Sequence, residues 1–182
     1  MVAKTAVPSS RRVGGVAGEV TSSKAKRKTH VVKVRAGQGE IHSFLDVFRA
    51  EPLARVRIIK DGVSTSYVDR MAREMGMPKE RLLPALGLSP ATVNRRARES
   101  KKLSTEDSER VVGMARLVGQ VQAMVNESGD PNGFNAAEWV ARWLEEPLAA
   151  LGGQRPVELM DTTEGQAIVS NLLARVQSGA YA

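Results

Sequence analysis

The 182-residue sequence contains no cysteine and few histidines or aromatic residues, and each scarcity excludes a kind of chemistry. Without cysteine there is no disulfide, no thiolate nucleophile and no thiolate-bound zinc or iron–sulfur cluster. His30 and His42 are the only histidines, so a histidine-rich metal site or a serine–histidine relay has almost no residues to use. We expect a protein that is not an enzyme and holds no metal or cofactor, because no acid, base and nucleophile cluster in its sequence.

Long apolar runs are missing as well. No stretch approaches the roughly 18 apolar residues that a membrane helix needs. The first segment, MVAKTAVPSSRRVGGVAGEV, has no apolar core of signal-peptide length. These absences predict a cytoplasmic protein, and the chain length allows one medium domain or two small ones.

Charge is distributed unevenly along the chain, whose formal net charge is +7. Residues 1–37 sum to +8, residues 38–78 to zero, residues 79–102 to +5 and residues 103–182 to −6. A basic tail and a basic internal block followed by an acidic region are typical of a chain that binds two kinds of partner.

Residues 1–40 have the composition of a flexible basic tail. Gly, Ser, Lys and Arg dominate, and apolar residues recur at neither a helical nor a strand period, although residues 30–34 could form one short strand. Two interpretations stay open at this point: a solubilising arm, or an arm that adds non-specific affinity for DNA phosphates.

From Ser43 onward, helix signals follow one another. Prolines occupy positions suited to the first turn of a helix, and glycines follow the last apolar residue of several helical patterns. The expected helix caps of the later helices are Ser89, Ser104, Asn135 and Asp161. Because few segments alternate apolar with polar residues, we expect an all-α fold with a first helical domain over residues 41–103 and a second over 104–182.

The segment 81–102, RLLPALGLSPATVNRRARESKK, predicts two helices that meet at a turn centred on Gly87. Leu88, Val93 and Ala97 are expected on the packed side of the second helix, and Pro84 is expected to kink the first. The opposite side offers groups that read bases and hold phosphates in DNA. The candidate DNA-binding residues are Ser89, Ala91, Thr92, Asn94, Arg95, Arg98 and Lys101.

This segment resembles the helix-turn-helix of Xre/Cro-like repressors, which bind DNA as dimers. It departs from that pattern where Leu83 replaces a usual alanine and Arg96 replaces a late apolar anchor. The other interpretation is a plain helical hairpin whose Arg and Lys side chains are simply solvated. GLSPA also imitates a nucleophile elbow, but neither a preceding strand nor a histidine partner accompanies it, so Ser89 is expected to be a helix cap.

The remainder resembles the C-terminal toxin-binding domain of Xre- and ParS-like antitoxins, which pair with RES-domain toxins. The resemblance rests on LSTEDSERVVGMARLVGQV, FNAAEWVARWLEEPLAALGGQRPVELM and DTTEGQAIVSNLLARVQSGAYA. It implies that this domain binds an NAD-depleting toxin and obstructs its active-site entrance, while the helix-turn-helix represses the shared operon. Trp139 and Trp143 are expected to pack in the core.

The last helix is expected to place Ile168, Leu172 and Val176 on one face, part of which packs on the tryptophan helix. The chain beyond has little left to bury, so we expect Arg175, Gly179 and Tyr181 to contact the toxin, with the tyrosine as anchor. Three alternatives stay open: a stand-alone transcriptional regulator, an adaptor without a DNA role, and an antitoxin of an ADP-ribosylating toxin.

Overall fold

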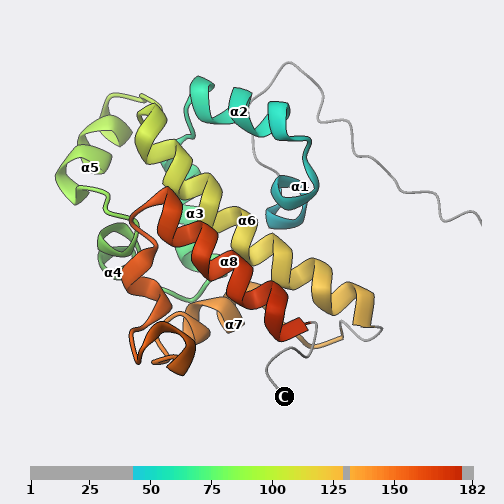
Figure 1. Cartoon of the computed structure of the whole chain (residues 1–182). Coiled ribbons are helices and arrows are strands. Elements are labelled where there is room, and N and C mark those ends of the chain that lie inside the picture. Colours follow the sequence, from blue (N-terminus) through green and yellow to red (C-terminus); the bar gives the residue numbers. More distant parts are fainter. Residues whose placement is uncertain (1–42, 129–131, 178–182) are drawn as a thin grey trace, which may run out of the picture. The chain divides into compact units, whose positions relative to one another are not determined.

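The computed structural model describes residues 43–128 and 132–177, and every regular element within these ranges is a helix (Figure 1). None of these helices is both long and apolar enough to cross a bilayer. The expected all-α fold is confirmed. The elements are α1 (Phe44–Arg49), α2 (Pro52–Asp61), α3 (Thr65–Glu74), α4 (Lys79–Ala85), α5 (Pro90–Arg98), α6 (Thr105–Ser128), α7 (Ala136–Trp143), the 3₁₀ turns η1 (Ala149–Leu151) and η2 (Pro156–Leu159), and α8 (Thr163–Gln177).

Side-chain oxygens set most of the helix starts. Ser64 Oγ accepts the N–H of Tyr67 at 3.3 Å, and Ser104 Oγ accepts that of Asp107 at 3.2 Å. The cap expected at Asp161 is wrong: the Oγ1 of Thr162 accepts the N–H of Gly165 at 3.1 Å instead. Because α8 begins at Thr163, the residue before it is the one whose side chain reaches the free N–H groups.

Helix α6 lies at the centre of the packing, with α1, α2, α7 and α8 all against it. It can serve several neighbours because its buried residues lie on more than one side, and they include Val111, Val112, Met114, Leu117 and Val118. Gly119 allows α1 to approach closely, since a Cβ there would overlap the carbonyl group of Phe44. Helix α6 therefore packs against helices from both ends of the described chain.

Helices α3, α4 and α5 pack on one another, and two polar contacts hold the α2–α3 loop, one to α6 and one to the α5–α6 loop. The Oγ of the fully buried Ser108 accepts the N–H of Val63 at 2.9 Å. The N–H of Leu103 donates to the carbonyl of Val63 at 2.8 Å. Since one apolar core includes residues on both sides of position 103, the expected division between residues 103 and 104 stays a prediction.

Helix α8 packs on α6 and η2, and only part of its expected apolar face is buried. Val169, Leu172 and Leu173 are buried, whereas Ile168 is 42% exposed, so Leu172 belongs to the packed part of the expected face and Ile168 to its exposed part. The side chain of Val176 lies outside the described part. The reason is the direction from which α6 approaches: it contacts the side one residue further along the helix, and nothing in the sequence fixes that direction.

Candidate nucleic-acid and partner interfaces

The turn between α4 and α5 is closed by the chain's own backbone. Gly87 has a φ of 62°, a left-handed conformation that glycine adopts without strain. Its N–H donates to the carbonyl of Pro84 and the N–H of Leu88 donates to that of Leu83, both at 2.8 Å. Pro84, the expected site of a kink, lies in the last turn of α4, which ends one residue later. The turn thus fixes where α5 begins.

Helix α5 is held to the body of the protein mainly by its first half. Ser89 Oγ accepts the N–H of Thr92 at 3.4 Å, which confirms the expected cap, and Val93 is fully buried. The structure brings the candidate DNA-binding residues onto one surface of α5 and the segment after it. Ser89, Ala91, Asn94, Arg95, Arg98 and Lys101 are exposed, and Thr92 is half-buried. Their contact with DNA stays a prediction.

The second half of α5 packs differently from the expectation. Ala97 is exposed, so its expected place beside Val93 on the packed side is wrong. Arg96 is the half-buried residue of that turn, and its Nη1 donates to the carbonyl of Lys102 at 2.8 Å. The Arg96 guanidinium group thus ties the segment after the helix back to α5.

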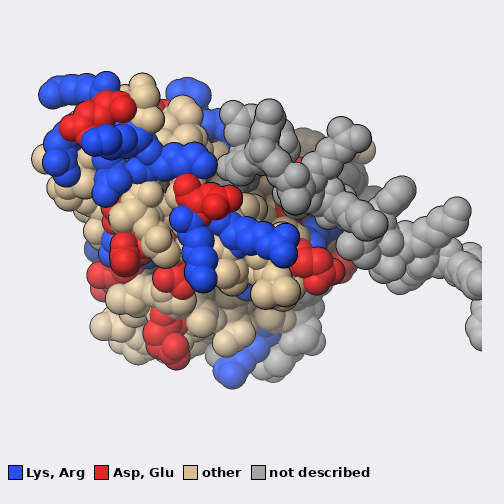
Figure 2. Space-filling view, turned by 90° about the horizontal axis from the view of Figure 1, so that it is seen from above, with Lys and Arg blue, Asp and Glu red and all other residues tan. Residues whose placement is uncertain are grey.

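Charged side chains surround the end of α5, where Figure 2 shows Lys and Arg gathered at the left of the view. One of these cations pairs with an acid: Lys101 Nζ contacts a Glu99 carboxylate oxygen at 3.0 Å. This hydrogen bond and the charge of Lys101, with smaller contributions from Arg95 and Arg96, lower the pKa of Glu99. Both partners are exposed, so the pair is weak and a phosphate can replace the carboxylate.

The C-terminal end of α2 lies beside this basic surface, which the sequence did not indicate. A Cβ on Gly62 would come within 3.0 Å of the Lys102 Cβ, so the two segments are in contact. The exposed Lys60 and Asp61, at the end of α2, therefore lie near Lys102. Summing charge over residues 38–78 concealed them, because that segment totals zero.

Three aromatic rings form a second exposed feature, on and just before α7. Trp139 and Trp143 stack with ring centroids 5.9 Å apart, and Phe134 lies 6.2 Å from Trp139. The two tryptophans pack against the core but stay partly exposed, and Phe134 is 39% exposed. The two tryptophans thus pack against the core, as expected, but only in part. The sequence did not predict that Phe134 would lie beside them.

Two of the three expected toxin contacts, Gly179 and Tyr181, lie outside the described residues. Arg175 is exposed near the end of α8. Within the described ranges no group of three or more His, Asp or Glu side chains could hold a metal ion.

Comparison with known proteins identifies both halves of this arrangement. Residues 54–116 match the antitoxin Xre-like helix-turn-helix domain, and residues 129–179 match the antitoxin Xre/MbcA/ParS C-terminal toxin-binding domain. A protein of Sphingobium sp. (strain YBL2), the Prs ADP-ribosylating antitoxin, is 50% identical over 136 residues, which span 75% of this chain and 86% of the relative. The chain belongs to the Xre family of antitoxins.

A more distant relative agrees with this assignment. Antitoxin Xre of Yersinia enterocolitica serotype O:8 / biotype 1B (strain NCTC 13174 / 8081) is 28% identical over 123 residues, 68% of this chain and 78% of its own length. In the antitoxin described here, the helix-turn-helix match ends inside α6. The toxin-binding match includes the aromatic rings, α7 and α8.

Proposed function

We propose that the antitoxin neutralises a RES-domain toxin by obstructing the entrance to its active site, acting by binding and not by catalysis. The match of residues 129–179 to a toxin-binding domain carries this proposal. The name of the Sphingobium relative, Prs ADP-ribosylating antitoxin, supports a partner that uses NAD. ADP-ribosyl transfer and NAD hydrolysis both break the bond between nicotinamide and ribose, so either activity fits an NAD-consuming toxin.

The toxin contacts are best placed at the end of α8 and on the aromatic rings. Arg175 is exposed and can donate forked hydrogen bonds to a carboxylate. The rings of Phe134, Trp139 and Trp143 provide rigid apolar area with exposed edges, the composition of interface hot spots. Residues 178–182, with Tyr181 as anchor, would extend from α8 into the toxin.

Co-expression with the product of the neighbouring toxin-like gene tests this proposal through the NAD content of the cells. The full chain should preserve NAD, and a chain that lacks residues 177–182 should protect less. The variant Gln154→Ala, in an exposed loop, serves as control and should protect fully. If the full chain fails to preserve NAD, the proposed toxin class is wrong; if the truncated chain protects equally, inhibition uses another surface.

We further propose that the antitoxin represses its own operon by binding the operator as a homodimer. The exposed face of α5 supports this role, because it presents guanidinium and amide groups beside a helix start. Arg95→Ala should cost about 1–3 kcal/mol on the operator and little on random DNA. Arg142→Ala, an exposed arginine on α7, is the control in the same gel-shift assay. Absence of any shift with upstream DNA would instead leave an adaptor that binds the toxin alone.

A further inference from the structure

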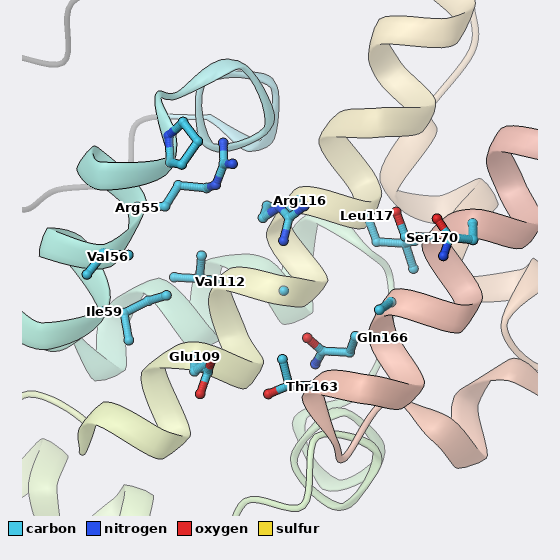
Figure 3. A pocket seen from close by; sticks show the side chains of 14 residues that line it. Arg55, Val56, Ile59, Glu109, Val112, Arg116, Leu117, Thr163, Gln166 and Ser170 are labelled. Carbon is cyan, nitrogen blue, oxygen red and sulfur yellow. The ribbon is translucent and has the colours of Figure 1, made fainter.

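A groove of about 380 Å³ lies between α2, α6 and α8 (Figure 3). Its lining includes two guanidinium groups, those of Arg55 and Arg116, and the carboxylate of Glu109. Apolar side chains of α2 and amide and hydroxyl groups of α8 complete it, so the lining is mixed in charge and in polarity. This lining selects no single class of ligand, whereas the segment that follows α5 is more specific.

Helix α5 ends in a backbone conformation that glycine usually provides. Ser100 has a φ of 52°, the only positive value among the non-glycine residues of the described ranges. Its N–H donates to the carbonyl of Ala97 at 3.2 Å, and the N–H of Lys101 donates to that of Arg96 at 2.8 Å. These two bonds close the end of the helix, and glycine would close it in the same way without strain. Serine at this position therefore costs the fold stability that glycine would not.

The Ser100 side chain is exposed, and its hydroxyl group forms no hydrogen bond within the described residues. The strain is therefore not offset by a polar contact of this side chain inside the described part of the protein. Strained residues of this kind gather where a protein binds or reacts, because the strain holds a group in a useful place. The hydroxyl group of Ser100 is thus available to a partner.

The chain on either side of Ser100 is held in place. Arg96 Nη1, on α5, donates to the carbonyl of Lys102 at 2.8 Å. The N–H of Leu103 donates to the carbonyl of Val63 at 2.8 Å, and Leu103 is buried. The Ser100 hydroxyl group therefore has a defined position relative to α5.

The charges near Ser100 favour an anion, although acids are present among them. The charged side chains on and next to this segment are the cations Lys60, Arg95, Arg96, Arg98, Lys101 and Lys102 and the acids Asp61, Glu99 and Glu106. They sum to +3. Glu99, the acid beside Ser100 in the chain, already pairs with Lys101.

We propose that the Ser100 hydroxyl group donates a hydrogen bond to a backbone phosphate of the operator. This inference rests on the proposed operator binding and adds a contact at the opposite end of α5 from Ser89. The 9 residues of α5 span about 13 Å. The major groove is about 12 Å wide, so a residue just beyond the helix comes to the edge of the groove, where the phosphates lie. A hydroxyl group already fixed in position makes such a contact with little loss of conformational freedom.

Three substitutions separate the hydroxyl group from the backbone conformation. Ser100→Ala removes the hydroxyl group and keeps the strain, Ser100→Gly removes both, and Ser100→Asn tolerates the left-handed conformation and supplies an amide donor. In gel shifts the alanine and glycine variants should each bind operator and random DNA about tenfold more weakly, and the asparagine variant should stay within about threefold of the wild type. Ser128→Ala, an exposed serine at the far end of α6, is the control and should bind as the wild type does.

Salt titrations and urea unfolding complete the test. Because serine is uncharged, Ser100→Ala should leave the salt slope unchanged, whereas Lys101→Ala should reduce it by about one. Ser100→Gly should unfold at a higher urea concentration than the wild type and yet bind DNA less tightly, a combination that a merely structural serine would not give. Wild-type affinity in Ser100→Ala refutes the phosphate contact alone. Absence of any wild-type shift with upstream DNA refutes operator binding and the contact together.

Discussion

Two buried amides, Gln120 and Gln166, donate hydrogen bonds between α6 and α8, and a pair of substitutions can measure the contribution of Gln166. Gln166 Nε2 donates to the carbonyls of Arg110 at 3.0 Å and Met160 at 2.8 Å. Gly113 lies directly beneath it on α6, where a Cβ would overlap the amide group. Gln166→Ala should therefore lower the free energy of unfolding by about 2 kcal/mol, because it removes two hydrogen bonds and leaves a buried carbonyl without a partner.

The effect of Gly113→Ala on the free energy of unfolding should change sign with the residue at position 166. In a helix, alanine is favoured over glycine by about 1 kcal/mol. In the wild-type background the new methyl group displaces the Gln166 amide, which then loses its hydrogen bonds. We therefore expect the free energy of unfolding to fall by about 1 kcal/mol. In the Gln166→Ala background the obstruction is gone, and the same change should stabilise by about 1 kcal/mol.

Urea unfolding followed by circular dichroism at 222 nm gives all four free energies of the cycle. The expected coupling between the two positions is about 2 kcal/mol, the value of the displaced hydrogen bonds. Asn126→Ala, on the exposed side of α6, is the control: it should stabilise by a few tenths of a kcal/mol in either background. If Gly113→Ala destabilises equally with and without Gln166, the proposed obstruction is refuted.

Further predictions concern α5, the residues after it and the basic tail. Ser100 has a φ of 52°, the only positive value among non-glycine residues of the described part, so Ser100→Gly should raise the free energy of unfolding by about 0.5–1 kcal/mol in urea titrations, whereas Ser128→Gly should lower it. Lys101→Ala should weaken operator and random DNA alike and reduce the salt slope by about one, and an unchanged slope would remove this lysine from the phosphate contacts. Glu99→Gln should strengthen binding to random DNA in the same titration, because it removes the carboxylate that pairs with Lys101. Deletion of residues 1–37 should lower non-specific DNA affinity and its salt dependence while the melting temperature hardly changes; a large drop would show that this segment is structural.

Local signals in the sequence were sufficient for the helix order and most helix ends. Ser89 caps α5 and Gly87 closes the turn before it, because both effects act within a few residues of the chain. The cap of α8 was misplaced by one residue for the same local reason: Asp161 and Thr162 are both good caps, and only the start of the helix decides between them.

Which side of a helix is buried depended on neighbours that the sequence does not reveal. Ala97 and Ile168 fit the apolar period of their helices, yet both are exposed, because the packed neighbours contact a different side. The groove and the Gln166 hydrogen bonds were equally beyond prediction. They join residues more than 50 positions apart, and no spacing rule connects such positions.

Because α6 is central to the packing, the proposed toxin interface and the proposed DNA interface both depend on the stability of this one helix. Local unfolding of α6 would release α8 and α7 on one side and the Ser108 contact to the α2–α3 loop on the other. A single proteolytic cut in this helix would thus free the toxin and the operator at the same moment. Variants that loosen α6 should therefore weaken toxin binding and DNA binding together, which titrations of both partners would measure.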